Sequence, residues 1–356
     1  MERLFERELN GAREALEKQP LRNHHYHFLK YQLALEQHSQ VAQQRRSGTL
    51  HLQPVLDELT RYYLADLLRH ACNVAALPAA SAESVELPLL PAALAHLETS
   101  TDPTPALAIY LHAYQALLQG EEGETHYRRL KHLLLQHWAA FPPEEARALC
   151  LLAINYCIRR LNRGERPFIK EAFELFRLAI ERNVLLENDR LSPFTYNNIL
   201  MLALALKEFD WAFRFLQDYR PYLPENEREN FYHYNLAVYH FRRSEYARAM
   251  RLLQGVKLRD KHYNLNARRI LLRIYFELGE FEALHSLLGS FSTYIRRQQD
   301  LGYHGEMYLN LIRFTRKLLR YDPQNERQRA KIRRELENTP AVAEREWLLK
   351  QLDEKV

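Results

Sequence analysis

A ten-residue phrase occurs three times in the second half of the chain. It reads KEFDWAFRFL at 207–216, SEYARAMRLL at 244–253 and GEFEALHSLL at 279–288. Each copy has an acidic residue, then an aromatic residue, and then Ala and Leu at helical spacing, and the aromatic residues are 37 and 35 positions apart. A period of this length indicates two-helix units, each of which buries its apolar face only by stacking against the next unit.

The aromatic residue of each phrase, Phe209, Tyr246 or Phe281, is expected to fill the wedge that is left where two helices meet at a turn. Small residues such as Ala237 and Ala249 are expected to let neighbouring helix backbones approach closely. The phrase is therefore interpreted as a packing signal for the second helix of each pair.

The composition favours helices over strands throughout the chain. Gly and Pro number only 10 and 15 among 356 residues, while Leu, Ala, Arg and Glu dominate and the β-branched residues are sparse. Short connections between helices of this size predict antiparallel neighbours. The expected helices lie at 1–18, 22–45, 54–77, 89–97, 104–119, 124–139, 143–161, 167–182, 193–206, 209–219, 226–243, 245–254, 262–277 and 280–290, followed by one long and two shorter helices.

The stretch HYNLAVYHFRRSEYARAM at 233–250 resembles the tetratricopeptide repeat. Residues 234–237 stand where that family has Tyr-Asn-Leu-Gly, Tyr246 stands at its turn-following Tyr, and Ala249 at its small position in the second helix. The resemblance covers about 145 to 290 and does not extend to the first hundred residues. It implies an all-α, right-handed α-solenoid of antiparallel helical hairpins, closed by N- and C-terminal capping helices.

Three regions are expected along the chain. Residues 1–100 form an N-terminal helical region that ends in a connector rich in Pro, Ala, Ser and Thr, residues 101–294 form the repeats, and residues 295–356 form a basic helical cap. The connector can equally be a surface loop within one continuous array. In the cap, residues 347–349 (Trp-Leu-Leu) are expected to fold back onto the array.

No motif of a known catalytic or cofactor site occurs. The chain has no G-x-S-x-G, no Gly-rich phosphate loop and no CxxC pair, so we expect no enzyme and no cofactor. Cys72, Cys150 and Cys157 are expected in the core of a protein from a reducing compartment. The tightest histidine cluster, at 24–27, raises a metal hypothesis, against which we favour a polar, solvated helix start, since no acid lies beside it.

The ends and the charge of the chain exclude further classes. The first 18 residues are charged and amphipathic, unlike a secretory signal, and the longest apolar run, at 199–206, is far shorter than a membrane helix needs. We therefore expect a soluble, cytoplasmic protein with no membrane partner. A net charge of +5 is mild for a dedicated nucleic-acid binder.

The resemblance also implies a concave surface that receives peptides, lined by the first helix of each pair. The Lys and Asn clamp that some members use for a terminal carboxylate is not reproduced, and the alternative is that these positions are ordinary exposed helix faces. The groove positions of the family correspond here to Asn197, Met201, Tyr234, Val238, Arg242, Arg269 and Arg273.

A strongly basic stretch lies near the C-terminus. It could dock phosphate backbones or an acidic partner, although charge runs on terminal helices are usually solvated faces. Its members are Arg313, Arg316, Lys317, Arg320, Arg327, Arg329, Lys331, Arg333 and Arg334.

These observations predict a non-enzymatic scaffold or adaptor that binds a peptide or partner protein in its concave groove. The first alternative is a nucleic-acid-binding protein that uses the basic C-terminal helices. The second is a regulator that senses a small peptide. The sequence specifies neither the partner nor the oligomeric state.

Overall fold

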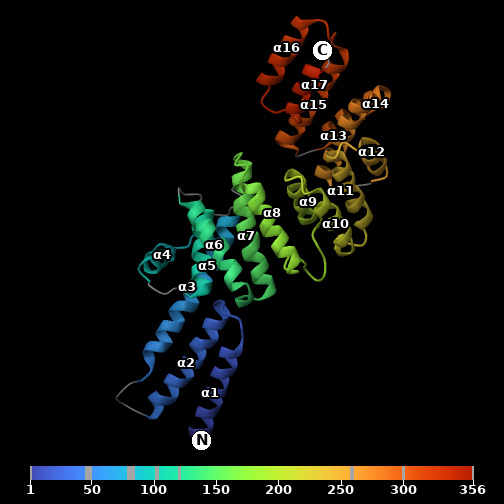
Figure 1. Cartoon of the computed structure of the whole chain (residues 1–356). Helices are drawn as coiled ribbons and strands as arrows, with labels where there is room; N and C mark the ends of the chain where they lie inside the picture. Colours follow the sequence, from blue (N-terminus) through green and yellow to red (C-terminus); the bar gives the residue numbers. More distant parts are fainter. Residues whose placement is uncertain are drawn as a thin grey trace. The chain divides into compact units, whose positions relative to one another are not determined.

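The structure is a computed structural model that describes residues 2–44, 50–77, 85–100, 104–118, 122–256, 260–298 and 301–354. These residues are all-α: they form seventeen α-helices, two short 3-10 helices and no strand beyond a single bridge between Glu187 and Arg190 (Figure 1). The all-helical prediction is confirmed. None of these helices is long and apolar enough to cross a lipid bilayer.

The chain divides into two compact units, Met1–Arg190 and Leu191–Val356. The expected boundaries near residues 100 and 294 remain predictions. Each unit is described by itself below.

The described residues of the first unit form eight α-helices. α2 packs along α3, α3 packs on α5 and α7, and α5 also contacts α6. The core of α3 contains Ala65, Leu68 and Ala71, whose spacing of three residues places them on one fully buried face. The helices are α1 (Glu2–Lys18), α2 (His24–Gln44), α3 (Leu52–Ala76), α4 (Leu90–Thr99), α5 (Pro105–Leu117), α6 (Gly123–His137), α7 (Pro143–Asn162) and α8 (Phe168–Glu181).

The second unit contains nine helices among its described residues. α14 extends seven residues beyond the predicted end at 290, because Leu288, Phe291 and Ile295 continue the buried face past Gly289. The helices are α9 (Pro193–Ala205), α10 (Phe209–Asp218), α11 (Arg228–Arg242), α12 (Tyr246–Gln254), α13 (Lys261–Leu278), α14 (Phe281–Arg297), α15 (Gly302–Arg320), α16 (Glu326–Asn338) and α17 (Arg345–Glu354).

The repeated phrase forms the same turn three times. Lys207, Ser244 and Gly279 adopt left-handed backbone angles, with φ of 61°, 60° and 72°. The following glutamate amide donates each time to the carbonyl of the residue five positions earlier, at 2.9 Å. This is the pattern that ends a helix and caps its free carbonyl groups. The helices α10, α12 and α14 then begin at the aromatic residue of the phrase.

One of the three aromatic residues of the phrase does not behave as predicted. Phe209 packs edge-on against Tyr239 of α11, with ring centroids 6.3 Å apart, and Tyr246 lies near Phe241. Phe281 is 45% exposed, so the prediction that it fills a wedge is wrong.

The positions three residues later are the common packing points. Ala212, Ala249 and Leu284 are each completely buried. The first helices of successive pairs contact each other in the order α9, α11, α13, and the second helices α10 and α12 each contact the next first helix. This packing is compatible with a helical repeat protein.

The C-terminal helix α17 folds back onto α13, as the sequence predicts. Trp347 and Leu348 are buried, and Leu349 packs partly against the same core. The indole Nε1 of Trp347 donates to Glu277 at 2.7 Å, and its ring meets Phe276 edge-on.

Candidate functional site

All seven predicted groove residues line one cavity of the second unit. The cavity, called the groove cavity here, has a volume of about 170 Å³. Spacings of four residues place the members from each helix on one face, so α9, α11 and α13 contribute adjacent stripes. Its lining residues are Asn197, Met201, Tyr234, Val238, Phe241, Arg242, Asn266, Arg269, Ile270, Arg273 and Glu344.

The walls of the groove cavity combine a buried apolar part with arginines. Tyr234 and Val238 are buried, whereas Arg242 at the end of α11 is exposed. The guanidinium of Arg273 lies 4.8 Å from the ring centroid of Phe241. Such a surface can hold an acidic side chain and also contact its aliphatic part.

Four lining residues were not predicted from the sequence, namely Phe241, Asn266, Ile270 and Glu344, and Glu344 is the one that carries a charge. Its carboxylate pairs with Arg269 through Oε1, and Arg273 donates to Oε2 at 2.7 Å. Glu344 and Arg273 are 71 positions apart in the chain, and no repeat or periodicity relates them. Two of the predicted groove residues therefore already bind a carboxylate, supplied by the chain itself.

The segment before α17 carries Glu344 into the groove cavity. The backbone nitrogen of Ala343 donates to the carbonyl of Met307 at 3.1 Å, and the Asn310 amide donates to the carbonyl of Ala341 at 2.7 Å. Glu344 itself has a left-handed φ of 55°, which is uncommon for a residue with a side chain. Anchors on α15 hold the segment in this conformation.

Both arginines remain charged at neutral pH. Burial lowers the pKa of Arg273 to about 10, with the neighbouring Arg269 adding to the effect. Burial also lowers the pKa of Arg269. Because a guanidinium starts from a very high pKa, it stays protonated here and can exchange one carboxylate for another.

Five of the nine residues of the predicted basic stretch line a cavity, and the other four lie outside it. These five, Arg313, Arg316, Lys317, Arg320 and Lys331, line a second and larger opening between α14, α15 and α16. Arg327, Arg329 and Arg334 lie on α16 outside that lining, and Arg333 pairs with Asp353 and Glu337.

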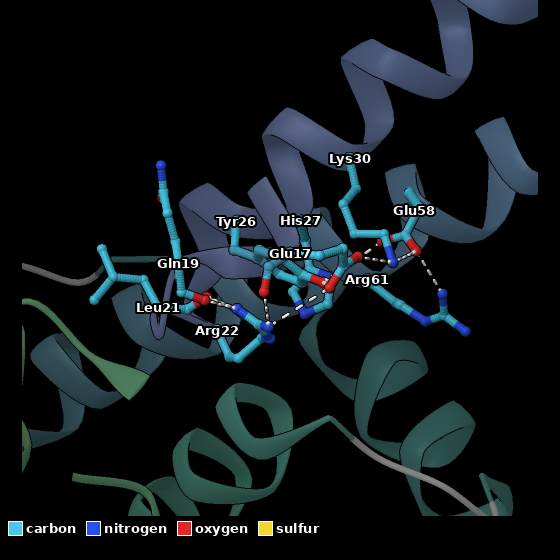
Figure 2. Close-up of polar contacts among 9 residues, drawn as sticks. All are labelled: Glu17, Gln19, Leu21, Arg22, Tyr26, His27, Lys30, Glu58 and Arg61. Atoms are coloured by element: carbon cyan, nitrogen blue, oxygen red, sulfur yellow. Dashed lines mark hydrogen bonds and ion pairs between the residues drawn. The ribbon is translucent and has the colours of Figure 1, made fainter. Parts of the chain in front are cut away.

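The histidine cluster belongs to a polar network of the first unit, and the expectation of a solvated helix start is wrong for His27. This side chain is buried, and its Nδ1 lies 3.1 Å from the carboxylate of Glu58, with which it pairs. Lys30 lies 3.5 Å from both Glu17 and Glu58, and Figure 2 shows how it lies between the two acids. The acids come from other helices, so residues near the cluster in sequence gave no sign of them.

A third acidic residue contacts the start of the same helix. Glu145 of α7 accepts hydrogen bonds from Asn23 and Tyr110 and pairs with His24 at 3.5 Å. Burial raises the pKa of Glu145, but the hydrogen bonds from His24, Asn23 and Tyr110 outweigh it and hold the pKa below its ordinary value. These pairings fix the packing of the N-terminal helices.

The cysteine thiols are buried, and the possible metal ligands among the described residues are not clustered. Cys72, Cys150 and Cys157 are buried free thiols, as predicted, and burial raises the pKa of each. In the described ranges no three His, Cys, Asp or Glu side chains are arranged so that they could hold a metal ion.

No protein-family model matches this chain, and no curated protein was found to be similar to it.

Proposed function

We propose that the chain is a protein-interaction scaffold that binds an acidic segment of a partner protein in the groove cavity. The observation that carries this proposal is the pairing of Arg269 and Arg273 with the carboxylate of Glu344, in a cavity lined by all seven predicted groove residues. The resemblance to tetratricopeptide repeats and the turn formed three times by the phrase support a right-handed α-solenoid. The role is non-enzymatic.

The ligand is an acidic side chain because of the size and charge of the groove cavity. A volume of about 170 Å³ accommodates one side chain and not a folded element. Two adjacent guanidinium groups select a carboxylate, to which Arg offers paired donors. A partner Asp or Glu therefore enters where Glu344 lies, and the rest of the partner segment contacts the exposed Arg242 and the neighbouring helix faces.

Glu344 is then a built-in competitor. A partner must displace it before the arginines can bind a new carboxylate, so the observed affinity is reduced by the free energy of the internal pair. The internal pair also prevents two guanidinium groups from lying side by side without a counter-charge in the absence of a partner.

Affinity capture with quantitative mass spectrometry tests this proposal. The baits are the wild type, Glu344→Gln, and the triple variant Arg242→Ala, Arg269→Ala and Arg273→Ala. We expect acidic partners to be enriched by Glu344→Gln and lost with the triple variant. Glu346→Gln is the matched control, because Glu346 is exposed and its replacement changes the net charge equally. Identical partner lists for all baits whose circular dichroism is native would refute the proposal.

Binding of nucleic acid and sensing of a small peptide remain predictions.

A further inference from the structure

The larger opening between α14, α15 and α16, called the basic cleft here, is independent of the groove cavity. It has a volume of about 650 Å³. We propose that the basic cleft binds a small anion that carries several phosphate groups. Six cationic side chains line it, together with one acid, Glu335: they are Arg296, Arg313, Arg316, Lys317, Arg320 and Lys331.

Three helices converge to gather these charges. Arg313, Arg316, Lys317 and Arg320 recur at spacings of one, three and four residues, so they share one face of α15. Arg296 comes from the last turn of α14, and Lys331 comes from α16. The packing of the fold brings charges from separate helices together. An isolated charged helix face has only the charges of its own helix.

The cations of the basic cleft are only partly neutralised by the chain. Lys317 pairs with Glu335, Arg316 donates to the carbonyl of Leu288 at 3.2 Å, and Arg313 donates to Thr339. The exposed side chains of Arg296, Arg320 and Lys331 form no ion pair with any other residue that the structure describes. Like charges gathered without counter-charges cost free energy, and an anionic ligand offsets this cost.

A buried aromatic ring that does not itself line the basic cleft supports two of its cations. The ring of Phe314 is completely buried, with the Arg313 guanidinium 4.7 Å and the Lys317 ammonium 5.5 Å from its centroid. Ile312 and Ile332, which line the basic cleft, are also buried. Side chains that rest on such a base lose less conformational entropy when they bind a ligand than free surface side chains do.

Phosphate groups fit this lining better than a nucleic-acid strand does. Arg offers paired donors to phosphate oxygens, and four of the six cations are Arg. No Phe, Tyr or Trp lines the basic cleft, so it lacks the aromatic platform on which single strands stack their bases. Its volume is in the range of small-molecule sites, which bind ligands far smaller than a duplex.

Isothermal titration calorimetry with sodium tripolyphosphate tests the proposal on the full chain at about 0.15 M salt, where diffuse surface attraction is largely screened. The test variant carries Arg320→Gln and Lys331→Gln. The matched control carries Arg327→Gln and Arg334→Gln, which remove the same charge from exposed positions outside the lining. We expect the test variant to bind at least about tenfold more weakly, as removal of charge-assisted contacts predicts, and the control to bind within about twofold of the wild type.

Titrations with further ligands identify which class of phosphate compound the basic cleft binds. Adenosine triphosphate, inositol hexakisphosphate, a single-stranded oligonucleotide and a duplex are titrated in the same way. Tighter binding of any of the three small ligands than of either nucleic acid supports the proposal and names its class. No binding of the small ligands, equal weakening by both double variants, or tighter binding of an oligonucleotide would overturn it. All variants alter exposed side chains, and circular dichroism verifies their folding.

Discussion

Replacing Glu344 with glutamine removes the negative charge that Arg269 and Arg273 share, while the size of the side chain stays the same. One oxygen remains to accept a hydrogen bond, so the change tests the charge itself. The left-handed backbone at position 344 is kept, because the new residue has the same Cβ and chain length.

The magnitude follows from the exposure of the three side chains. Glu344 is 14% exposed, and Arg269 and Arg273 are 21% and 22% exposed. Breaking a fully buried pair costs about 3–5 kcal/mol, whereas a fully exposed pair contributes about 0–1 kcal/mol. For this nearly buried site we expect a loss of about 2 kcal/mol in the free energy of unfolding, or about 4–8 °C in Tm for a unit of this size.

The same free energy no longer opposes an incoming acidic ligand. Since about 1.4 kcal/mol corresponds to a tenfold change in affinity, a labelled glutamate-rich peptide is expected to bind up to about 30-fold more tightly to Glu344→Gln. Differential scanning fluorimetry and fluorescence anisotropy measure the two effects. If Glu344→Gln and the control Glu346→Gln have the same Tm and the same peptide affinity, then Glu344 is not a competitor and the reasoning is refuted.

Three further perturbations test other parts of the structure. Ala249→Leu overfills a completely buried helix contact and is expected to cost about 1–3 kcal/mol in urea unfolding, whereas the same change at the exposed Ala247 is expected to be nearly neutral. Burial, with His126 adding to it, lowers the pKa of His112 to about 4. The unfolded chain then binds the proton first, so stability falls from about pH 6.5 towards pH 4. Replacing His112 with Gln should flatten the dependence of Tm on pH in that window, and an unchanged slope would contradict it. Burial raises the pKa of Glu58, but its hydrogen bond from His27 and the nearby cations outweigh this, and the pKa is lowered overall. The stabilisation is present above the ordinary pKa and is lost on acidification below about pH 4.5. Glu58→Gln should therefore flatten the dependence of Tm on pH below about pH 4.5 and should lower Tm at neutral pH. Equal Tm values of the variant and the wild type at neutral pH would count against the network.

The positions of the helices could be predicted because apolar spacing and turn residues are local signals. The end of α14 was missed because Gly289 resembles a stop, although Phe291 and Ile295 continue the buried face. The groove residues could be named because the repeat fixes which positions on successive first helices face one side, and all seven line one cavity.

The remaining site features depend on contacts between distant segments. Glu344 reaches Arg273 across 71 positions, and His27 meets Glu58 across 31. Neither pair follows a period, and charged residues are common along this chain, which has 50 Lys and Arg and 45 Asp and Glu. Only the packing of the helices decides which acid lies beside which base.

The turn formed at Lys207, Ser244 and Gly279 has a consequence for how such a chain can change its length. Because φ is nearly equal at Lys207 and Ser244, and the next amide makes the same hydrogen bond, removing 208–244 connects Lys207 directly to Glu245 and is expected to keep the local geometry. The first helix α9 then precedes α12 with an unchanged link. Gene rearrangement at equivalent points can therefore shorten or lengthen the protein by whole units without designing a new junction.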